Sequence, residues 1–253
     1  MSDAVPLEPY DMRLLDPPYD FPGYRSTGLR APSRPLLVLP ATEADAAGPI
    51  FGEGVVGPLD HDLTAHHADE PQGQRITIEG QLLDTAGRPI AGQLIEVWQA
   101  NAAGRYRHRV DDHPAPLDPN FTGYGRCRTD SLGRYRFVTI RPGSYPWGNH
   151  PNAWRPAHVH FSVFGRAFTH RLVTQMYFPD DPLLSFDPIF GSVGARQARS
   201  AMVATFDLSR TVPQHSLGYH FDVVVGGPAA VDAAEALDQD AARGALPEGA
   251  PGR

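Results

Sequence analysis

Short segments in which apolar and polar residues alternate run from residue 74 to residue 227, and clusters of Gly and Pro separate them. The segment 74–84 places Ile76, Ile78 and Leu82 at alternate positions, which is the period of a strand with one buried face. The 253 residues include 25 Gly and 26 Pro, and both residue types interrupt long helices. The pattern therefore predicts an all-β fold, an antiparallel β-sandwich with few short helices.

Further strands and one helix are expected at defined places in this series. Alternation or high apolar content predicts strands over 92–100, 157–165, 171–178 and 218–227. The turn residues DSLG at 130–133 separate GRCRT from RYRFVTI, and this spacing predicts a hairpin. The segment 194–207 is rich in Ala and other helix formers, so we expect a helix there.

The composition divides the chain into three parts. Residues 1–70 are too rich in Pro for a long helix or a central strand, and we expect an extended arm that lies on its own domain or on a partner. Residues 71–227 form the predicted sandwich. Residues 228–253 are dominated by Ala, Asp, Glu, Gly and Pro, which predicts a mobile tail.

Charge and cysteine content restrict the possible partners. The net charge of -7 disfavours nucleic acid, and the basic stretch 105–110 is expected to form local salt bridges. No stretch approaches the ~20 apolar residues that span a bilayer, and the N-terminus lacks the pattern of a signal peptide. Cys127 is the single cysteine, which excludes an internal disulfide and a zinc site of several thiolates. We expect a cytoplasmic protein that binds neither nucleic acid nor membrane.

Two histidines, His158 and His160, stand two residues apart in an apolar strand and so share one face. They are either packed histidines or metal ligands. No Asp or Glu follows closely, which counts against an iron(II) site of two histidines and a carboxylate, although a distant carboxylate would complete one. The nearby loops supply Tyr106 and Tyr145, which lie among Gly and Pro residues. A second histidine cluster at 59–67 lacks strand spacing, and we interpret it as structural.

Three long segments carry a family resemblance: EVWQANAAGRYRHR (96–109), LDPNFTGYGRCRTDSLGRYRFVTIRPGSYPWGN (117–149) and NAWRPAHVHFSVFG (152–165). Together they resemble the intradiol ring-cleaving dioxygenases, and within that family the beta subunits of protocatechuate 3,4-dioxygenases. The resemblance extends from about Tyr24 to about Gly226. The tail and the stretch 164–171 do not match.

The resemblance implies a ferric iron site and a reaction. The ligands would be Tyr106, Tyr145, His158 and His160. The reaction would be intradiol cleavage of protocatechuate by O2, which gives 3-carboxy-cis,cis-muconate. Tyr145 would be displaced by the catechol and take one of its protons. The other catalytic residues implied are Arg155, which would stabilise the reacting ring, and Gln175, which would hold Arg155 or the substrate.

The resemblance also implies how the substrate is bound and by what assembly. Trp98 and Trp147 would wall the pocket, whereas Tyr24 and Arg30 would approach the substrate carboxylate. A homologous alpha subunit would complete the pocket in a hetero-oligomer. Three alternatives stay open: an intradiol dioxygenase for another catechol, a noncatalytic transthyretin-like binding sandwich, and a zinc hydrolase that uses the histidine pair with a distant carboxylate.

Overall fold

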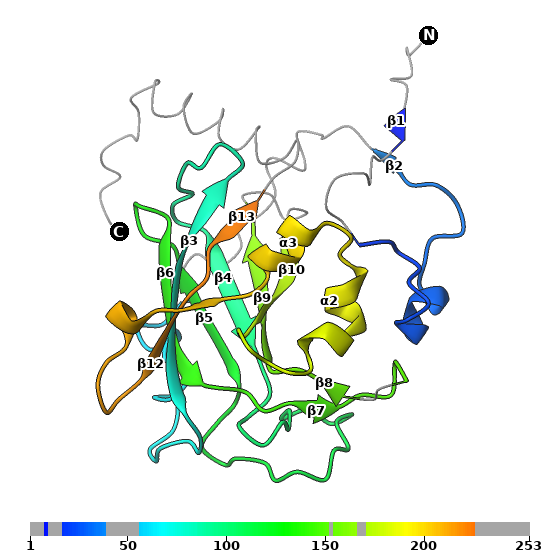
Figure 1. The fold of residues 1–253 in the computed structure, drawn as a ribbon. Helices are drawn as coiled ribbons and strands as arrows, with labels where there is room; N and C mark the ends of the chain where they lie inside the picture. The colour runs from blue at the N-terminus through cyan, green and yellow to red at the C-terminus, as the bar shows by residue number, and fades with distance from the viewer. Residues whose placement is uncertain (1–7, 10–16, 39–55, 152–153, 166–170, 226–253) are drawn as a thin grey trace, which may run out of the picture.

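The computed structural model describes residues 8–9, 17–38, 56–151, 154–165 and 171–225 (Figure 1). Most of their regular structure is strand, and the helices among them are short. The α-helices are α2 (Pro188–Ser192) and α3 (Arg196–Ala201), and the 3-10 helices are η1 (Arg25–Leu29), η2 (Leu184–Phe186) and η3 (Leu208–Arg210). The expected predominance of strands with few helices is confirmed. The helix expected over 194–207 is shorter, because the chain enters strand β11 (Thr205–Phe206).

Two larger sheets contain most of the strands. The first has the order β10 (Arg171–Tyr177), β9 (His158–Phe164), β4 (Leu94–Trp98) and β5 (Tyr124–Arg128), and all its pairs are antiparallel. In the second, β3 (Arg75–Asp84) pairs with β6 (Arg134–Ile140), β12 (Leu217–His220) and β13 (Val223–Val225), and β11 pairs with β12. The expectation of purely antiparallel sheets is corrected here, because β12 and β13 both run parallel to β3.

The hairpin predicted around residues 130–133 is wrong. The turn itself forms, since Gly133 N–H donates to the Asp130 carbonyl at 2.9 Å. However, β5 pairs with β4 and β6 pairs with β3, so the turn carries the chain from one sheet to the other. Local turn residues cannot distinguish the two outcomes, because partners far along the chain decide which strand pairs with which.

The strand predicted over 218–227 is divided into β12 and β13. Between them, the Asp222 side chain accepts the Gln81 N–H at 2.8 Å, and Phe221 N–H donates to the Glu79 carbonyl at 2.9 Å. A carboxylate thus replaces one backbone acceptor of the ladder. Residues 226 and 227 lie outside the described residues.

One hydrophobic core takes side chains from both sheets. Ile78 and Phe137 of the second sheet and Val97 and Phe161 of the first are at most 1 % exposed. The Phe137 and Phe161 rings meet edge to face with centroids 6.2 Å apart. Burial of each such side chain stabilises the fold by about 1.5–3 kcal/mol. The shared core fixes one sheet against the other.

Part of the segment expected to form an arm packs into this core. Leu63 is fully buried, and its N–H donates to the Val138 carbonyl of β6 at 2.9 Å. Nearer the N-terminus, β1 (Glu8–Pro9) pairs with β2 (Leu37–Val38), and η1 lies between them in the chain. Arg25 N–H donates to the Asn149 carbonyl at 2.9 Å, which ties the η1 segment to the loop after Tyr145.

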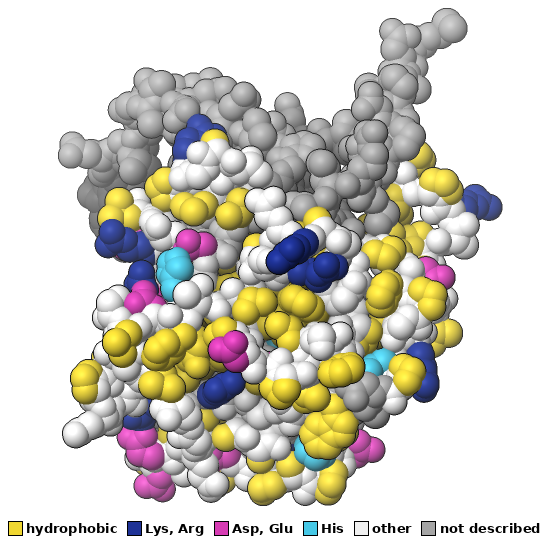
Figure 2. All heavy atoms as spheres, in the orientation of Figure 1, with side chains coloured by type: hydrophobic (Ala, Val, Ile, Leu, Met, Phe, Trp, Pro, Cys, Tyr) yellow, Lys and Arg dark blue, Asp and Glu magenta, His cyan; other side chains and the backbone are white. Residues whose placement is uncertain are grey.

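No helix within the described ranges is long and apolar enough to cross a membrane. On the face drawn in Figure 2, side chains of both charges lie among hydrophobic ones.

Candidate active site

Strand β9 carries the histidine pair, and its neighbours supply two further predicted residues. His160 is opposite Trp98 on β4 and opposite Gln175 on β10. The Trp98 and His160 rings stack in parallel with centroids 4.7 Å apart and planes 2° apart. The stacking fixes the plane of the imidazole. Central placement in a four-stranded sheet therefore holds His160 from both sides.

Tyr145 reaches the histidines through a two-residue ladder between β7 (Tyr145–Pro146) and β8 (Trp154–Arg155). In this ladder Tyr145 is opposite Arg155, three residues before His158. The Tyr145 hydroxyl lies 3.4 Å from His158 Nε2. Pairing across a loop thus brings together a tyrosine and a histidine that are 13 positions apart.

Two glycines allow the loop that carries Tyr106 to close against the Tyr145 loop. Gly104 has a φ of +78°, and a Cβ there would lie 2.2 Å from the Ser144 carbonyl oxygen. A Cβ at Gly143 would lie 2.4 Å from the Ala102 carbonyl oxygen. Only residues without a side chain permit both approaches. The buried Asn101 side chain stabilises the turn, since it accepts N–H groups from Ala103 and Arg105 at 3.0 and 2.9 Å.

The four predicted ligands form a closed series of ring contacts. Centroids are 5.4 Å apart between Tyr106 and Tyr145, 5.5 Å between Tyr145 and His158, 4.8 Å between His158 and His160, and 6.4 Å between His160 and Tyr106. Two phenol and two imidazole groups therefore surround one small region.

The protonation and hydrogen bonding of these groups fit a metal ion. The Tyr106 hydroxyl is buried and has no hydrogen-bond partner, which is costly unless a ligand satisfies it. His158 Nδ1 lies 2.8 Å from the Pro156 carbonyl. A carbonyl only accepts, so Nδ1 carries the proton and Nε2 keeps its lone pair, with Arg155 Nη1 at 3.0 Å and the Tyr145 hydroxyl at 3.4 Å.

The pKa values agree with this tautomer and explain the need for a cation. Burial, with the Arg155 charge, lowers the pKa of His158 well below its usual value and that of His160 to about 3, so both imidazoles are neutral at pH 7, the form that a metal ion binds. Burial raises the pKa of Tyr106 well above 10, so a phenolate there requires a strong local positive charge. Among the described residues no group of three or more His, Cys, Asp or Glu would hold a metal, so this set depends on its tyrosines.

Arg155 stands beside the ligand set in a buried cluster. Its Nη1 lies 3.0 Å from His158 Nε2 and 3.4 Å from the Tyr145 hydroxyl. Its Nη2 donates to Gln175 Oε1 at 2.6 Å and to Asp187 Oδ2 at 2.7 Å. Burial alone would lower the Arg155 pKa, but Tyr177, Tyr145 and Asp187 outweigh it and raise the pKa, so the cation persists.

The predicted substrate-binding residues extend from this cluster to the N-terminal segment. The Arg155 guanidinium lies 5.1 Å from the Trp147 ring centroid, and the Trp147 and Tyr24 rings meet at 4.7 Å. The Arg30 guanidinium lies 4.6 Å over the Tyr24 ring. Four predicted residues thus form one continuous chain of contacts.

Several residues that position this site were absent from the prediction, namely Asn101, Asp111, Tyr177 and Asp187. Asp111 accepts the Tyr106 N–H at 2.7 Å and forms a salt bridge with Arg105 at 3.7 Å, a local ion pair of the kind expected for the stretch 105–110. Asp187 precedes Pro188 and caps α2 by accepting the Ile189 N–H. The pair Asp-Pro is a readable helix start. No sequence signal linked it to Arg155.

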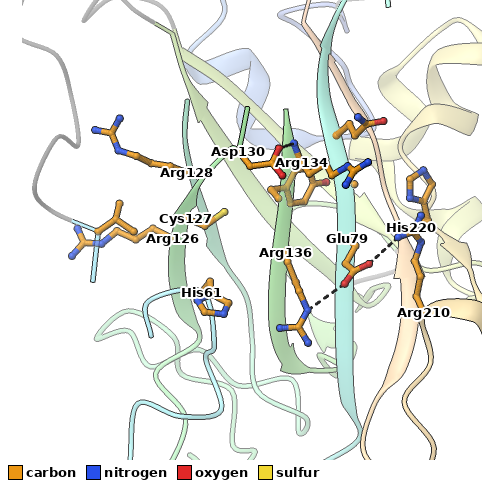
Figure 3. A pocket seen from close by; sticks show the side chains of 14 residues that line it. His61, Glu79, Arg126, Cys127, Arg128, Asp130, Arg134, Arg136, Arg210 and His220 are labelled. Carbon is orange, nitrogen blue, oxygen red and sulfur yellow. Dashed lines mark hydrogen bonds and ion pairs between the residues drawn. The ribbon is translucent and has the colours of Figure 1, made fainter. Parts of the chain in front are cut away.

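A cleft of about 790 Å³ lies apart from these residues (Figure 3). Its walls come mainly from β3, β5 and β6, and no predicted site residue lines it. Its charged side chains largely pair with one another or with neighbours, as Glu79 does with Arg136 and Arg210. His61, from the cluster interpreted as structural, also lines this cleft.

Comparison with known proteins identifies the class. A family model described as "Dioxygenase" matches residues 46–227, and one described as "Protocatechuate 3,4-dioxygenase beta subunit N terminal" matches residues 17–42. The crystal structure of 3-chlorocatechol 1,2-dioxygenase from Rhodococcus opacus 1CP superposes with a TM-score of 0.52 and 25% identity, covering 68% of this chain and 66% of that chain. The chain belongs to the intradiol ring-cleavage dioxygenase family.

Within that family, one similarity is much more extensive. The chain is 56% identical to the protocatechuate 3,4-dioxygenase beta chain of Burkholderia cepacia over 213 residues, 83% of this chain and 90% of that one. It is 28% identical to the alpha chain of the same organism, over 76% of this chain and 96% of that one. The resemblance stated from the sequence is thus confirmed.

Proposed function

We propose that this chain is the iron-bearing subunit of an enzyme that cleaves protocatechuate between its two hydroxyl-bearing carbons with O2. The product would be 3-carboxy-cis,cis-muconate. The observation that carries the proposal is the contact series of Tyr106, Tyr145, His158 and His160 around an unsatisfied, buried phenol hydroxyl. The extensive identity to a protocatechuate 3,4-dioxygenase beta chain supports the same substrate.

The donor set would suit iron in its ferric state, because phenolate oxygens are hard, anionic ligands. When bound, the ion would supply the positive charge that ionises both phenols and would draw electron density from a chelated catechol. Neutral His158 and His160 would contribute their lone pairs. No carboxylate is needed among the ligands, and Asp187 is already engaged by Arg155.

The chain's own residues would perform the remaining tasks. The Tyr145 hydroxyl oxygen would take one catechol proton, the role that the family resemblance assigns to it, and it lies 3.4 Å from Arg155 Nη1. Arg155 would place a fixed positive charge beside the ring and stabilise negative charge that develops there. Gln175 would hold the guanidinium through Nη2. Trp98 and Trp147 would form walls of the substrate pocket.

We further propose that the substrate carboxylate is met by the N-terminal segment. Arg30 lies over Tyr24, and Tyr24 contacts Trp147 beside Arg155. A pocket completed from this side would favour a catechol with an acidic substituent. Because alpha chains of protocatechuate 3,4-dioxygenases also align with this sequence, we propose assembly with a homologous alpha chain. Residues 1–70 would serve as the arm, 71–227 as the catalytic domain and 228–253 as the tail.

The test starts from protein expressed alone and with a homologous alpha chain. We expect about one iron per chain, visible absorption from ferric tyrosinate, and O2 uptake that is faster with protocatechuate than with catechol or hydroxyquinol. Faster turnover of one of the other two would support a dioxygenase for that catechol. Colourless protein without iron would support the binding sandwich, and bound zinc would support the hydrolase.

Tyr145→Phe tests the assigned proton acceptor. We expect this variant to retain iron through the other ligands and to lose turnover by about 10²–10⁴-fold, the usual contribution of a positioned base. Tyr219→Phe is the matched control, because Tyr219 lies on β12 of the second sheet and its ring packs against Phe178 and Phe206. Normal turnover in Tyr145→Phe would contradict the assignment.

A further inference from the structure

Asp187 is a buried carboxylate whose contacts converge on Arg155. Its side chain is fully buried, and that of Arg155 is 3% exposed. Asp187 Oδ2 accepts from Arg155 Nη2 at 2.7 Å and from the Tyr177 hydroxyl at 2.8 Å. Asp187 Oδ1 accepts from Arg155 Nε at 3.4 Å and from Ile189 N–H at 3.1 Å. Four donors therefore hold the carboxylate in one orientation.

This arrangement decides which edge of the guanidinium faces the ligands. The Nε and Nη2 edge faces Asp187, and only Nη1 is directed to His158 and Tyr145. A guanidinium is planar with its donors in a rigid fork, so fixing one edge fixes the other. Without a counter-charge beside it, the buried cation would be drawn to the two phenols next to it, Tyr177 at 3.1 Å from Nη2 and Tyr145 at 3.4 Å from Nη1. Of these two, only Tyr145 belongs to the predicted ligand set.

We propose that Asp187 is a positioning residue for the reaction. It holds Arg155 at a set distance from Tyr145, so that the substrate can displace Tyr145 from the metal site. Tyr177 supports the same carboxylate. This inference deepens the proposed function and rests on it for its catalytic meaning. The orientation of Arg155 can be tested without it.

Asp187→Asn separates this role from helix capping. Asn caps helices about as well as Asp, so the bond to Ile189 N–H can persist while the negative charge is lost. Asp207→Asn is the matched control. Asp207 also caps a short helix, through Ser209 N–H, and also pairs with an arginine, Arg210 at 2.8 Å, but lies outside the site.

In the iron-loaded protein we expect Asp187→Asn to lower kcat by about 10- to 100-fold, the usual cost of losing a partner behind a metal site, while iron content stays near that of the unaltered protein. KM should change much less. The ferric tyrosinate band should move to shorter wavelength, because a freed Arg155 would stabilise negative charge on Tyr145. Asp207→Asn should match the unaltered protein in all four measurements.

A double-mutant cycle shows whether Asp187 acts through Arg155. In an Arg155→Gln background, Asp187→Asn should change kcat by less than about 3-fold, because the group it positions is gone. An equal loss in both backgrounds, or unaltered kcat in the single variant, would overturn the inference. Should Asp187→Asn fail to fold, Tyr177→Phe removes one donor to Oδ2 without removing charge, and the same cycle applies with a smaller loss.

The metal-free protein provides a readout that is independent of activity. The Arg155 Nε–H should exchange slowly with solvent in ¹⁵N NMR spectra and lose this protection in Asp187→Asn. Unchanged protection would reject the inference whatever the activity. If the unaltered protein binds no iron while Asp187→Asn shows the predicted loss of protection, the proposed function is rejected and the inferred orientation of Arg155 stands.

Discussion

Gly104→Ala directly tests how the two tyrosine loops close around the candidate metal site. Gly104 precedes Tyr106 by two residues and has a φ of +78°. A Cβ at this position would lie 2.2 Å from the Ser144 carbonyl oxygen and 3.3 Å from Tyr145 Cβ. The substitution therefore pushes the Tyr106 loop away from the residues that carry Tyr145.

The expected cost has two parts that can be separated. Ala in a left-handed conformation costs roughly 1–2 kcal/mol relative to Gly, whatever surrounds it. Overpacking against the Ser144 backbone adds about 1–3 kcal/mol. Gly87→Ala is the matched control, because Gly87 has a φ of +76° and nothing within 4 Å of an added Cβ. Gly87→Ala should therefore lose only the free energy that Ala costs in a left-handed conformation.

We expect Gly104→Ala to reduce iron affinity and turnover more than its loss of unfolding free energy alone would suggest. A displacement of about 1 Å in a catalytic group can lower the rate about 100-fold, and both tyrosines border the clash. We expect Gly104→Ala to lose iron affinity and protocatechuate turnover, and Gly87→Ala to retain both. Urea unfolding followed by tryptophan fluorescence, iron analysis and O2 uptake measure the three effects. Equal stability loss in both variants, with normal iron content, would refute the close approach of the loops.

Two further predictions concern the segment that leads into the sheets. Leu63→Ala should lower the free energy of unfolding by about 2–5 kcal/mol, because the side chain is fully buried, whereas Leu59→Ala, at 56% exposed, should cost under 1 kcal/mol; equal urea midpoints would contradict the packing of this segment. Hydrogen bonds from the Arg126 side chain and from Gly57 N–H lower the pKa of Asp60. Ionised Asp60 therefore stabilises the folded state above about pH 4, and this stabilisation is lost as the pH falls through the lower folded pKa. Asp60→Asn should therefore flatten the acid-side decline in the urea midpoint, and an unchanged pH profile would argue against the ion pair.

Some of the fold and site could be predicted because the relevant information is local. A period of two residues located β3, and a short apolar run located β9, which is largely buried on both faces. The same period puts His158 and His160 on one face, and burial does not change that geometry. The loops also supplied Tyr106 and Tyr145 as candidates, but only the resemblance assigned them as ligands, since Tyr106 is more than 50 positions from the histidines along the chain.

The tertiary structure decided everything that depends on distant partners. Turn residues at 130–133 predicted a hairpin, but pairing of β5 with β4 and of β6 with β3 made the turn a crossing between sheets. Asp187 appears in sequence as a helix cap, yet folding places it 2.7 Å from Arg155, 32 positions earlier. Local residue preferences act over a few positions of the chain. The partner of a buried charge, in contrast, is whichever opposite charge the tertiary packing brings next to it, and only the folded chain determines which residue that is.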